Sequence, residues 1–369
     1  MKKVMIVVGT RPEAIKMFPV IIELYKRHGI RTIVCSTGQH KEMLNDVLNL
    51  FGVKVDYDLN IMKEGQDLRY ITETVLHKIC GILKKENPDV VLVHGDTTSA
   101  MATAVACFYS RIKVGHVEAG LRTEDINDPY PEEFNRRVIG LISRLDFAPT
   151  DNAKANLIKE GKPENYVYVT GNTVIDSLQY TIKDNYFHSE LQWSGDKKII
   201  LITAHRRENI GKPMIHMFRG IKRILYEFPD VKAIFPIHPN PLIRDIARTE
   251  LGGCPNLHII EPLSMIDFQN ILYKSYLVLT DSGGIQEEAV SLGKPVFVMR
   301  QKTERPEGVQ HGGIKLVGND EASIYNNFKV LISNPGIYKE MSKATTVYGD
   351  GRASQRIVDI LMNSMFGKE

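Results

Sequence analysis

The residues best suited to bind a ligand lie at 277–289 (LVLTDSGGIQEEA). The apolar start predicts a buried strand, and a turn containing Ser282, Gly283 and Gly284 then leads into a helix. Glycine has no Cβ, so the backbone of such a turn can approach a bulky anion closely. The first N–H groups of the helix and the positive end of its dipole favour phosphate. Glu288 lies four residues after Gly284 on the same helix face, where a sugar hydroxyl could meet it.

These features describe a site for a nucleotide diphosphate. The alternative is a tight turn between a strand and a helix, followed by a solvated acidic face, because glycine turns are common in all proteins.

Two cations open an earlier predicted helix, in residues 9–16 (GTRPEAIK). Arg11 can bind a phosphate through its planar guanidinium, and Lys16 can act as a point charge. The alternative is a surface pair balanced by Glu13.

Three carboxylates also occupy positions that suit acid–base chemistry. Asp96 and Glu118 each stand just past a predicted strand, and Glu132 begins a helix after Pro131. Carboxylates that converge push their pKa values apart, so that one can serve as a base while another stays protonated. For Glu132 and its neighbour Glu133, favourable electrostatics at a helix start is the alternative.

His205 follows the first strand of the second half of the chain and could donate a proton to a leaving phosphate. The alternative is a histidine held by local hydrogen bonds. Metal binding by His94 and His116 together with Asp96 and Glu118 is a less favoured possibility, and we expect neither a metal nor a cofactor. No GxGxxG or GxxxxGK[ST] motif is present, which argues against a dinucleotide or P-loop site.

Strands that alternate with helices must position these residues, and this pattern predicts parallel sheets with right-handed crossovers. The first series of predicted strands covers residues 3–9, 31–36, 89–94, 113–117, 145–150 and 166–170. After a polar stretch at 181–196, the second series covers residues 198–203, 231–237, 257–260, 276–280, 295–299 and 314–317.

We therefore expect an α/β protein with two Rossmann-like domains. The first covers residues 1–172, with a C-terminal helix at 353–369 that packs back on it, and the second covers residues 173–352 and contains the predicted nucleotide diphosphate site. In open α/β sheets, ligands bind at the carboxyl ends of the strands. The polar residues above lie at these ends, so two facing sheets would bring them together across one cleft.

Composition limits the possible functions. The chain has 369 residues, 43% hydrophobic and 25% charged, which is globular and long for a single core. A net charge of +3 and scattered basic residues argue against nucleic acid. The four cysteines form no CxxC pair, as in reduced cytoplasmic proteins. The apolar N-terminal run is too short for a signal sequence or a membrane span, so no membrane association is expected.

Ten short runs, in order along nearly the whole chain, together resemble the non-hydrolysing UDP-N-acetylglucosamine 2-epimerases. They are GTRPEAIK (9–16), HGDTT (94–98), GHVEAGLR (115–122), PEEFNR (131–136), GNTVID (171–176), HRRE (205–208), TDSGGIQEE (280–288), GKPVFVM (293–299), TERPE (303–307) and YGDG (348–351). Related enzymes that act on diacetamido uronic-acid sugars differ at the first run, so this run favours plain N-acetylglucosamine.

The resemblance implies a two-domain glycosyltransferase-B fold with the substrate between the domains. It implies reversible epimerisation of UDP-N-acetylglucosamine to UDP-N-acetylmannosamine, which supplies precursors of bacterial surface polysaccharide. The family's mechanism is anti elimination of UDP to 2-acetamidoglucal, followed by syn return of UDP. It also implies a homodimer.

The resemblance further assigns roles by position. The catalytic carboxylates are Asp96, Glu118 and Glu132, the essential histidine is His205, and Lys16 lies near the substrate. The UDP-binding residues are Arg11, Phe268, Ser282, Gly283, Gly284, Glu288 and Arg305.

Two positions depart from the family's pattern. Members activated by their substrate tend to have glutamine where this chain has Glu42, so we do not expect obligate activation. Leu263 replaces a more polar residue in the loop near the uracil.

Three other functions remain open. A glycosyltransferase of the same fold would need an acceptor groove. A catalytically silent nucleotide-sugar sensor would keep the glycine turn and lose the carboxylates. A hydrolysing epimerase would release free sugar and UDP.

Overall fold

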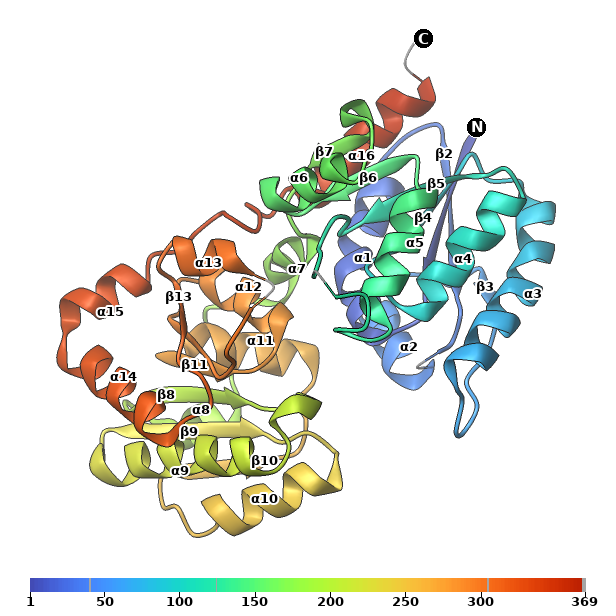
Figure 1. The fold of residues 1–369 in the computed structure, drawn as a ribbon. Helices are drawn as coiled ribbons and strands as arrows, with labels where there is room; N and C mark the ends of the chain where they lie inside the picture. The colour runs from blue at the N-terminus through green and yellow to red at the C-terminus, as the bar shows by residue number, and fades with distance from the viewer. Residues whose placement is uncertain (40, 124, 304, 367–369) are drawn as a thin grey trace. The chain divides into compact units, whose positions relative to one another are not determined.

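The computed structural model describes residues 1–39, 41–123, 125–303 and 305–366, and the side chains of residues 41–43 and 45 lie outside this description. The chain forms two compact units, each of which can be followed in Figure 1. Unit 1 consists of Met1–Ser177 and Tyr348–Glu369, and unit 2 consists of Leu178–Val347.

Unit 1 is built on a seven-stranded sheet in the order β3-β2-β1-β4-β5-β6-β7, and every pair of neighbouring strands is parallel. Its strands are β1 (Lys2–Val8), β2 (Ile30–Ser36), β3 (Tyr57–Asp58), β4 (Val90–His94), β5 (Lys113–Val117), β6 (Leu145–Ala148) and β7 (Val167–Val169). Its helices are α1 (Arg11–Tyr25), α2 (Lys41–Leu50), α3 (Leu68–Glu86), α4 (Thr98–Tyr109), α5 (Glu132–Ile142), α6 (Asp151–Lys159) and α7 (Thr173–Thr181), with a 3-10 turn, η1, at Glu164–Tyr166.

The strands of this sheet are apolar because helices cover both of its faces. All five residues of β4 are buried, and α4 is buried along most of its length because it packs between α3 and α5. The pattern of the sequence did not predict β3 or α6. A strand of two residues, such as β3, cannot show the period-2 alternation by which strands are recognised.

Unit 2 repeats the architecture with a six-stranded parallel sheet in the order β10-β9-β8-β11-β12-β13. Its strands are β8 (Lys198–Thr203), β9 (Val231–Pro236), β10 (Leu257–Ile260), β11 (Leu277–Thr280), β12 (Val296–Val298) and β13 (Ile314–Leu316). Its helices are α8 (Ser189–Ser194), α9 (Lys212–Glu227), α10 (Pro241–Leu251), α11 (Met265–Lys274), α12 (Gly283–Ser291), α13 (Pro306–Gln310), α14 (Glu321–Ser333) and α15 (Pro335–Met341), with a 3-10 turn, η2, at Arg207–Asn209.

The expected architecture of two parallel α/β domains is confirmed. The last helix, α16 (Ala353–Phe366), packs against α1, so the C-terminal segment returns to unit 1 as expected (Figure 1). The short α8 lies within the polar stretch for which the sequence pattern predicted no helix.

The first crossing between the units lies inside α7. The carboxylate of Asp176 accepts hydrogen bonds from the backbone N–H groups of Ala353 at 3.2 Å and Ser354 at 2.7 Å, at the start of α16. These bonds hold the first half of α7 in unit 1. The units therefore divide at 177 and 348, whereas the sequence suggested 172 and 353.

In both sheets the strand order reverses beside the first strand, between β1 and β4 in unit 1 and between β8 and β11 in unit 2. At such a point the two neighbouring crossovers run to opposite faces of the sheet, and the loops leave a crevice at the strand ends. The predicted functional residues of each unit should therefore lie around these two points. Within the described ranges, no helix combines the length and apolar character needed to cross a membrane.

Candidate active site

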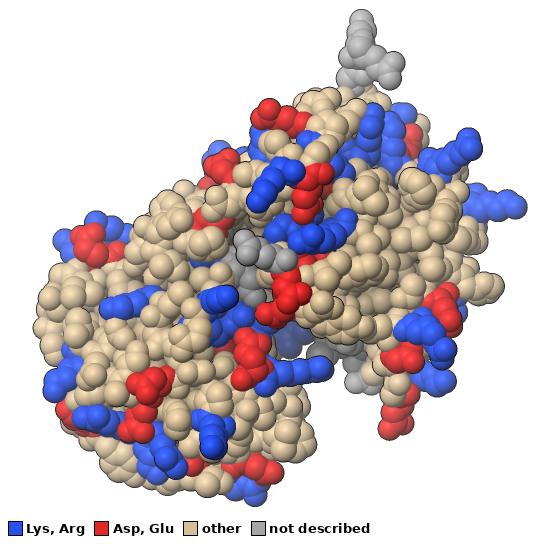
Figure 2. All heavy atoms as spheres, viewed as in Figure 1, with Lys and Arg blue, Asp and Glu red and all other residues tan. Residues whose placement is uncertain are grey.

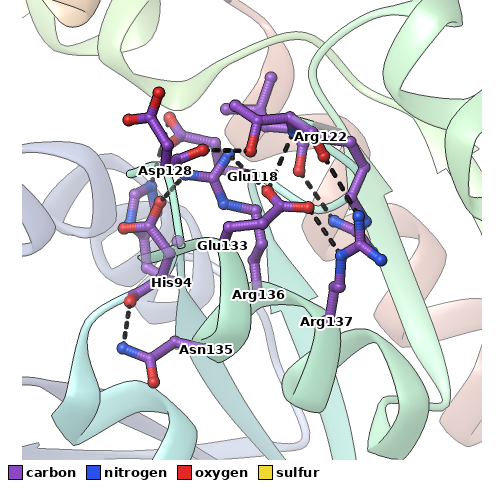
Figure 3. A network of polar contacts seen from close by, with 12 residues as sticks. His94, Glu118, Arg122, Asp128, Glu133, Asn135, Arg136 and Arg137 are labelled. Atoms are coloured by element: carbon purple, nitrogen blue, oxygen red, sulfur yellow. Dashed lines mark hydrogen bonds and ion pairs between the residues drawn. The ribbon is translucent and has the colours of Figure 1, made fainter. Parts of the chain in front are cut away.

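Glu118, which Figure 3 labels, is the centre of a buried polar group at the strand ends of unit 1. Its Oε2 atom forms an ion pair with Nζ of Lys16, which α1 carries. The same oxygen accepts a hydrogen bond from Nδ2 of Asn172 at 2.7 Å and lies 3.7 Å from Nε2 of His94. The side chain of Glu118 is only 8% exposed, so the lysine compensates a charge that has little access to water.

The backbone of Glu118 is also unusual. Its φ is +63°, in the left-handed region that residues with a Cβ rarely adopt. Such a conformation costs about 1–3 kcal/mol and persists only where the surroundings enforce it, most often at functional sites. Here the turn after β5 directs the carboxylate toward Lys16.

Asp96 lies in the turn after β4 and pairs with Arg136 of α5, with 2.9 Å between Oδ2 and Nη2. Nδ2 of Asn135, which Figure 3 labels, donates to the backbone oxygen of Asp96 at 2.8 Å. Burial raises the pKa of Asp96, Arg136 lowers it, and the charges of Glu118 and Glu132 raise it further. The carboxylates named from the sequence therefore act on one another electrostatically within unit 1.

Glu132 and Glu133 are neighbours on α5 with different surroundings. Glu133 is fully buried, and its carboxylate contacts Arg137 at 2.7 Å, Arg136 at 3.5 Å and the N–H of Thr123 at 3.0 Å (Figure 3). Oε2 of Glu132 is buried and has no hydrogen-bond partner among the described residues. Glu133 therefore has a structural role, whereas Glu132 retains an acceptor for a substrate or a proton.

Glu13 does not balance a surface pair with Arg11 and Lys16. It is buried and closes a capping box at the start of α1, where its carboxylate accepts from the N–H groups of Gly9 at 2.8 Å and Thr10 at 2.7 Å. Burial lowers the pKa of Arg11, which is half-buried at the first position of α1, and the charge of Asp46 opposes this shift.

His94 and His116 of unit 1 are buried. Burial lowers the pKa of His94 to about 4 and that of His116 to about 3. Nε2 of His116 lies 2.7 Å from the carbonyl oxygen of Gly95, so this nitrogen carries the proton. Among the described residues, no group of three or more His, Cys, Asp and Glu side chains has an arrangement that would hold a metal ion.

In unit 2, His205 and Asp281 lie at the ends of the neighbouring strands β8 and β11. The fully buried carboxylate of Asp281 accepts from the N–H groups of His205 at 3.1 Å and Arg206 at 3.0 Å, and from Nδ2 of Asn209 at 3.1 Å. Nε2 of His205 is 4.0 Å from Oδ1 of Asp281. Burial lowers the pKa of His205, and the charge of Asp281 partly opposes this shift.

The glycine turn opens α12 as the sequence predicted. Ser282 is the N-cap residue, and its side chain makes no capping hydrogen bond. A Cβ built on Gly283 would lie 2.6 Å from Nη1 of Arg305, so any other residue there would have to displace that guanidinium. Nε of Arg305 donates to buried Glu287 at 2.8 Å, which holds the arginine beside the start of α12.

The carboxylate of Glu288 is held by a residue of α11. Nε2 of Gln269 donates to Oε2 of Glu288 at 2.8 Å, and the side-chain Oε1 of Gln269 accepts from the hydroxyl of Thr181 at 2.5 Å. Phe268 precedes Gln269 on α11 and is half-buried. The sequence-predicted residues of unit 2 therefore lie in the loop after β8, on α11, at the start of α12 and along it, and in the segment before α13.

The sequence interpretation assigned no role to several residues that support the site, namely Arg136, Asn172, Asp281, Gln269 and Glu287. All of these except Gln269 stand inside the short runs quoted in the sequence analysis, so their positions offered a signal. Their roles depend on partners 18 to 76 residues away in the sequence, which no local pattern reveals.

Comparison with known proteins identifies the family of this chain. The sequence model of the family described as UDP-N-acetylglucosamine 2-epimerase matches residues 22–362. The chain is 53% identical to the UDP-N-acetylglucosamine 2-epimerase of Bacillus subtilis (strain 168) over 360 residues, which cover 98% of this chain and 95% of that protein.

Solved structures of this family also match the chain along nearly its whole length. A UDP-N-acetylglucosamine 2-epimerase structure from Listeria monocytogenes, described as putative, has a TM-score of 0.93 and 45% identity, and covers 100% of this chain and 98% of that one. The enzyme from Neisseria meningitidis, solved with bound UDP-GlcNAc, has a TM-score of 0.92 and 46% identity, and covers 98% and 100%. With two parallel α/β units of glycosyltransferase-B type, and with its sequence matched along nearly its whole length, this chain belongs to the UDP-N-acetylglucosamine 2-epimerase family.

Proposed function

We propose that this protein interconverts UDP-N-acetylglucosamine and UDP-N-acetylmannosamine without hydrolysis. The observation that carries the proposal is the cluster of Asp96, Glu118 and Glu132 around Lys16 and Arg136, where burial and mutual repulsion raise the pKa of Asp96. Carboxylates whose environments differ in this way suit a reaction that must remove a proton on one face of a carbon and return it on the other.

The groups of unit 2 support a complementary role, which is to bind the diphosphate. The start of α12 presents the backbone N–H groups of Gly283 and Gly284, and Arg305 lies beside Gly283. We assign Arg11, Ser282 and His205 to the phosphates, Glu288 to the ribose and Phe268 to the uracil. Bound to such donors, UDP becomes a better leaving group because its developing charge is stabilised.

The reaction that follows balances without a cofactor. A carboxylate takes the proton from C2, the C–H electrons form the C1–C2 double bond, and the C1–O electrons leave with the β-phosphate of UDP. The resulting 2-acetamidoglucal then accepts a proton on the opposite face of C2, and UDP adds back to C1. We assign this acid–base work to Asp96, Glu118 and Glu132, with Lys16 holding Glu118 ionised.

A single NMR experiment tests the proposal. Purified protein is incubated with UDP-N-acetylglucosamine in D2O without an acceptor. We expect a mixture of the two UDP-sugars with deuterium at C2 in both. Free sugar with UDP would instead identify a hydrolysing epimerase. Turnover only on addition of an acceptor would identify a glycosyltransferase, and binding without any turnover a sensor.

We further propose that the protein is a homodimer that uses the exposed faces of α4 and α5. Phe108 and Tyr109 at the end of α4 are 61% and 75% exposed, and Leu141 at the end of the neighbouring α5 is 85% exposed. Figure 2 shows few charged side chains over this face. Light scattering should give the mass of two chains, and Leu141→Glu should lower it to one.

We also propose a cytoplasmic location, since all four cysteines are free thiols. Obligate activation by substrate is not expected, but the side chain of Glu42, on which this expectation rests, lies outside the described residues. Kinetics with UDP-N-acetylmannosamine alone test it, because an activated enzyme would show a long lag that traces of the other epimer abolish.

A further inference from the structure

Asn172 is a buried residue at the first crossing between the units, and the family comparison gives it no role. It directly precedes α7 and is only 1% exposed. Its Oδ1 accepts from the N–H of Val174 at 3.2 Å, which caps the start of that helix. Its Nδ2 donates to Oε2 of Glu118 at 2.7 Å.

These two bonds fix the orientation of the amide. The helix start needs an acceptor, and the Oδ1 atom supplies it, so the NH2 group must face Glu118. An ionised carboxylate oxygen only accepts hydrogen bonds, whereas a protonated carboxyl oxygen is itself a donor and needs an acceptor. Asn172 therefore matches the ionised form of Glu118 and complements the ion pair with Lys16.

The backbone around Asn172 is held equally firmly. Its N–H donates to the carbonyl oxygen of Tyr348 at 2.6 Å, where the chain crosses back to unit 1. A Cβ on Gly171 would lie 2.9 Å from Cα of Gly349, so the two crossing segments pack backbone against backbone. Two bonds from Asp176 to the start of α16 hold α7 to the same segment.

From these contacts we infer that Asn172 is a positioning residue for the epimerisation, which ties the orientation and ionisation of Glu118 to the junction of the two crossing segments. The inference rests on the proposed function, in which Glu118 is a catalytic carboxylate. The left-handed backbone of Glu118 alone does not fix the position of its carboxylate. The hydrogen bond donated by Asn172 at the junction is also needed to hold it.

Asn172→Ser tests this inference, because serine also caps helices but cannot reach Glu118 with a donor. We expect kcat to fall about tenfold to a hundredfold, as for the loss of a hydrogen bond to a charged group. KM for UDP-N-acetylglucosamine and the Kd of UDP should change less than about threefold, since the donor bonds Glu118 and not the residues assigned to the phosphates. The acidic limb of the kcat/KM pH profile should move to higher pH, because the ionised carboxylate loses a stabilising donor.

A matched control and a second variant complete the test. Asn334 caps α15 of unit 2 through bonds to Gly336 and Ile337, so Asn334→Ser makes the same change away from the site and should leave kcat and the pH profile unaltered. Asn172→Asp keeps the cap and the shape but places a second negative charge beside Glu118. It should move the acidic limb further in the same direction and regain part of its activity at high pH.

A kcat within twofold of wild type in Asn172→Ser, or an unmoved pH profile in both Asn172 variants, would overturn the inference. Asn172→Ser and Asn334→Ser could also lose the same amount of activity, in proportion to an equal fall in melting temperature. That result would overturn the inference as well, because Asn172 would then act only as a helix cap. The proposed function fails separately, because in that case the wild-type protein itself would not introduce deuterium at C2.

Discussion

Units 1 and 2 share one architecture but place opposite chemistry at the same topological point. Beside the reversal between β1 and β4, unit 1 gathers Asp96, Glu118 and Glu132, with cations that only partly compensate them. Beside the reversal between β8 and β11, unit 2 presents N–H groups and Arg305, and its buried Asp281 is fully engaged by donors.

This difference shows that a parallel sheet supplies a place for a ligand and leaves the chemistry to the loops. The carboxylates of unit 1 suit proton transfer, and the donors of unit 2 suit a diphosphate. Each prediction below changes one side of this comparison, beginning with the largest expected effect.

Glu118→Gln and Glu132→Gln should each lower kcat about a thousandfold, which is within the usual contribution of a general acid or base. The melting temperature should stay close to that of wild type, because glutamine keeps the size of the side chain. Glu164→Gln, at an exposed ion pair of unit 1, provides the matched control. Near-normal turnover in both site variants would remove the carboxylates from the mechanism.

Asp281→Asn should act on stability more than any exposed change in unit 2. The carboxylate accepts from three N–H donors, and an asparagine would turn its own NH2 group toward some of them. We expect a loss of about 3 kcal/mol in the free energy of unfolding, as for a broken buried network. Urea denaturation followed by Trp193, the only tryptophan and a residue of unit 2, measures the loss. Asp230→Asn at an exposed pair should leave the midpoint unchanged.

Acidification should weaken unit 1 through its buried histidines. His94 and His116 have folded-state pKa values of about 4 and about 3, below the value of about 6.5 in an unfolded chain. In this pH range the unfolded state therefore binds more protons than the folded state. The free energy of unfolding falls as the pH drops through 6.5 toward 4.

Between pH 7 and pH 5.5 each of these histidines should cost about 1 kcal/mol of stability. The raised pKa of Asp96 and of Asp146 acts in the opposite direction, so a variant is needed to isolate one histidine. His116→Gln, whose amide can replace the bond to Gly95, should lose about 1 kcal/mol less than wild type over this range. Equal pH dependence in the two proteins, followed by circular dichroism, would contradict the prediction.

The smallest expected effect is a difference in stability between alanine variants of the two glycines of α12. Gly283→Ala should lower the stability of unit 2 by about 1 kcal/mol, because the new Cβ must displace the guanidinium of Arg305. Gly284→Ala meets no atom within 4 Å and should leave stability unchanged or raise it by about 0.5 kcal/mol through helix propensity. Melting temperatures of the ligand-free proteins measure both, and equal values would show that Arg305 moves aside freely.

The sequence by itself determined the two parallel sheets, because strands covered on both faces must be apolar along their length and helices must alternate with them. It also determined which residues stand at the strand ends, since Asp96, Glu118 and His205 directly follow apolar runs. The glycine turn at 283–284 was equally readable, because two adjacent glycines separate an apolar run from a helical pattern.

Only the tertiary structure decided which of these residues have polar atoms that remain accessible to a substrate and which are used in structural contacts. Adjacent Glu132 and Glu133 are identical in type, yet Glu133 is held by arginines while Oε2 of Glu132 has no partner among the described residues. Asn172 reaches Glu118 across 54 positions of sequence. Hydrogen bonds and ion pairs depend on distances of a few ångströms between atoms that the chain separates by tens of residues, and no local pattern encodes them.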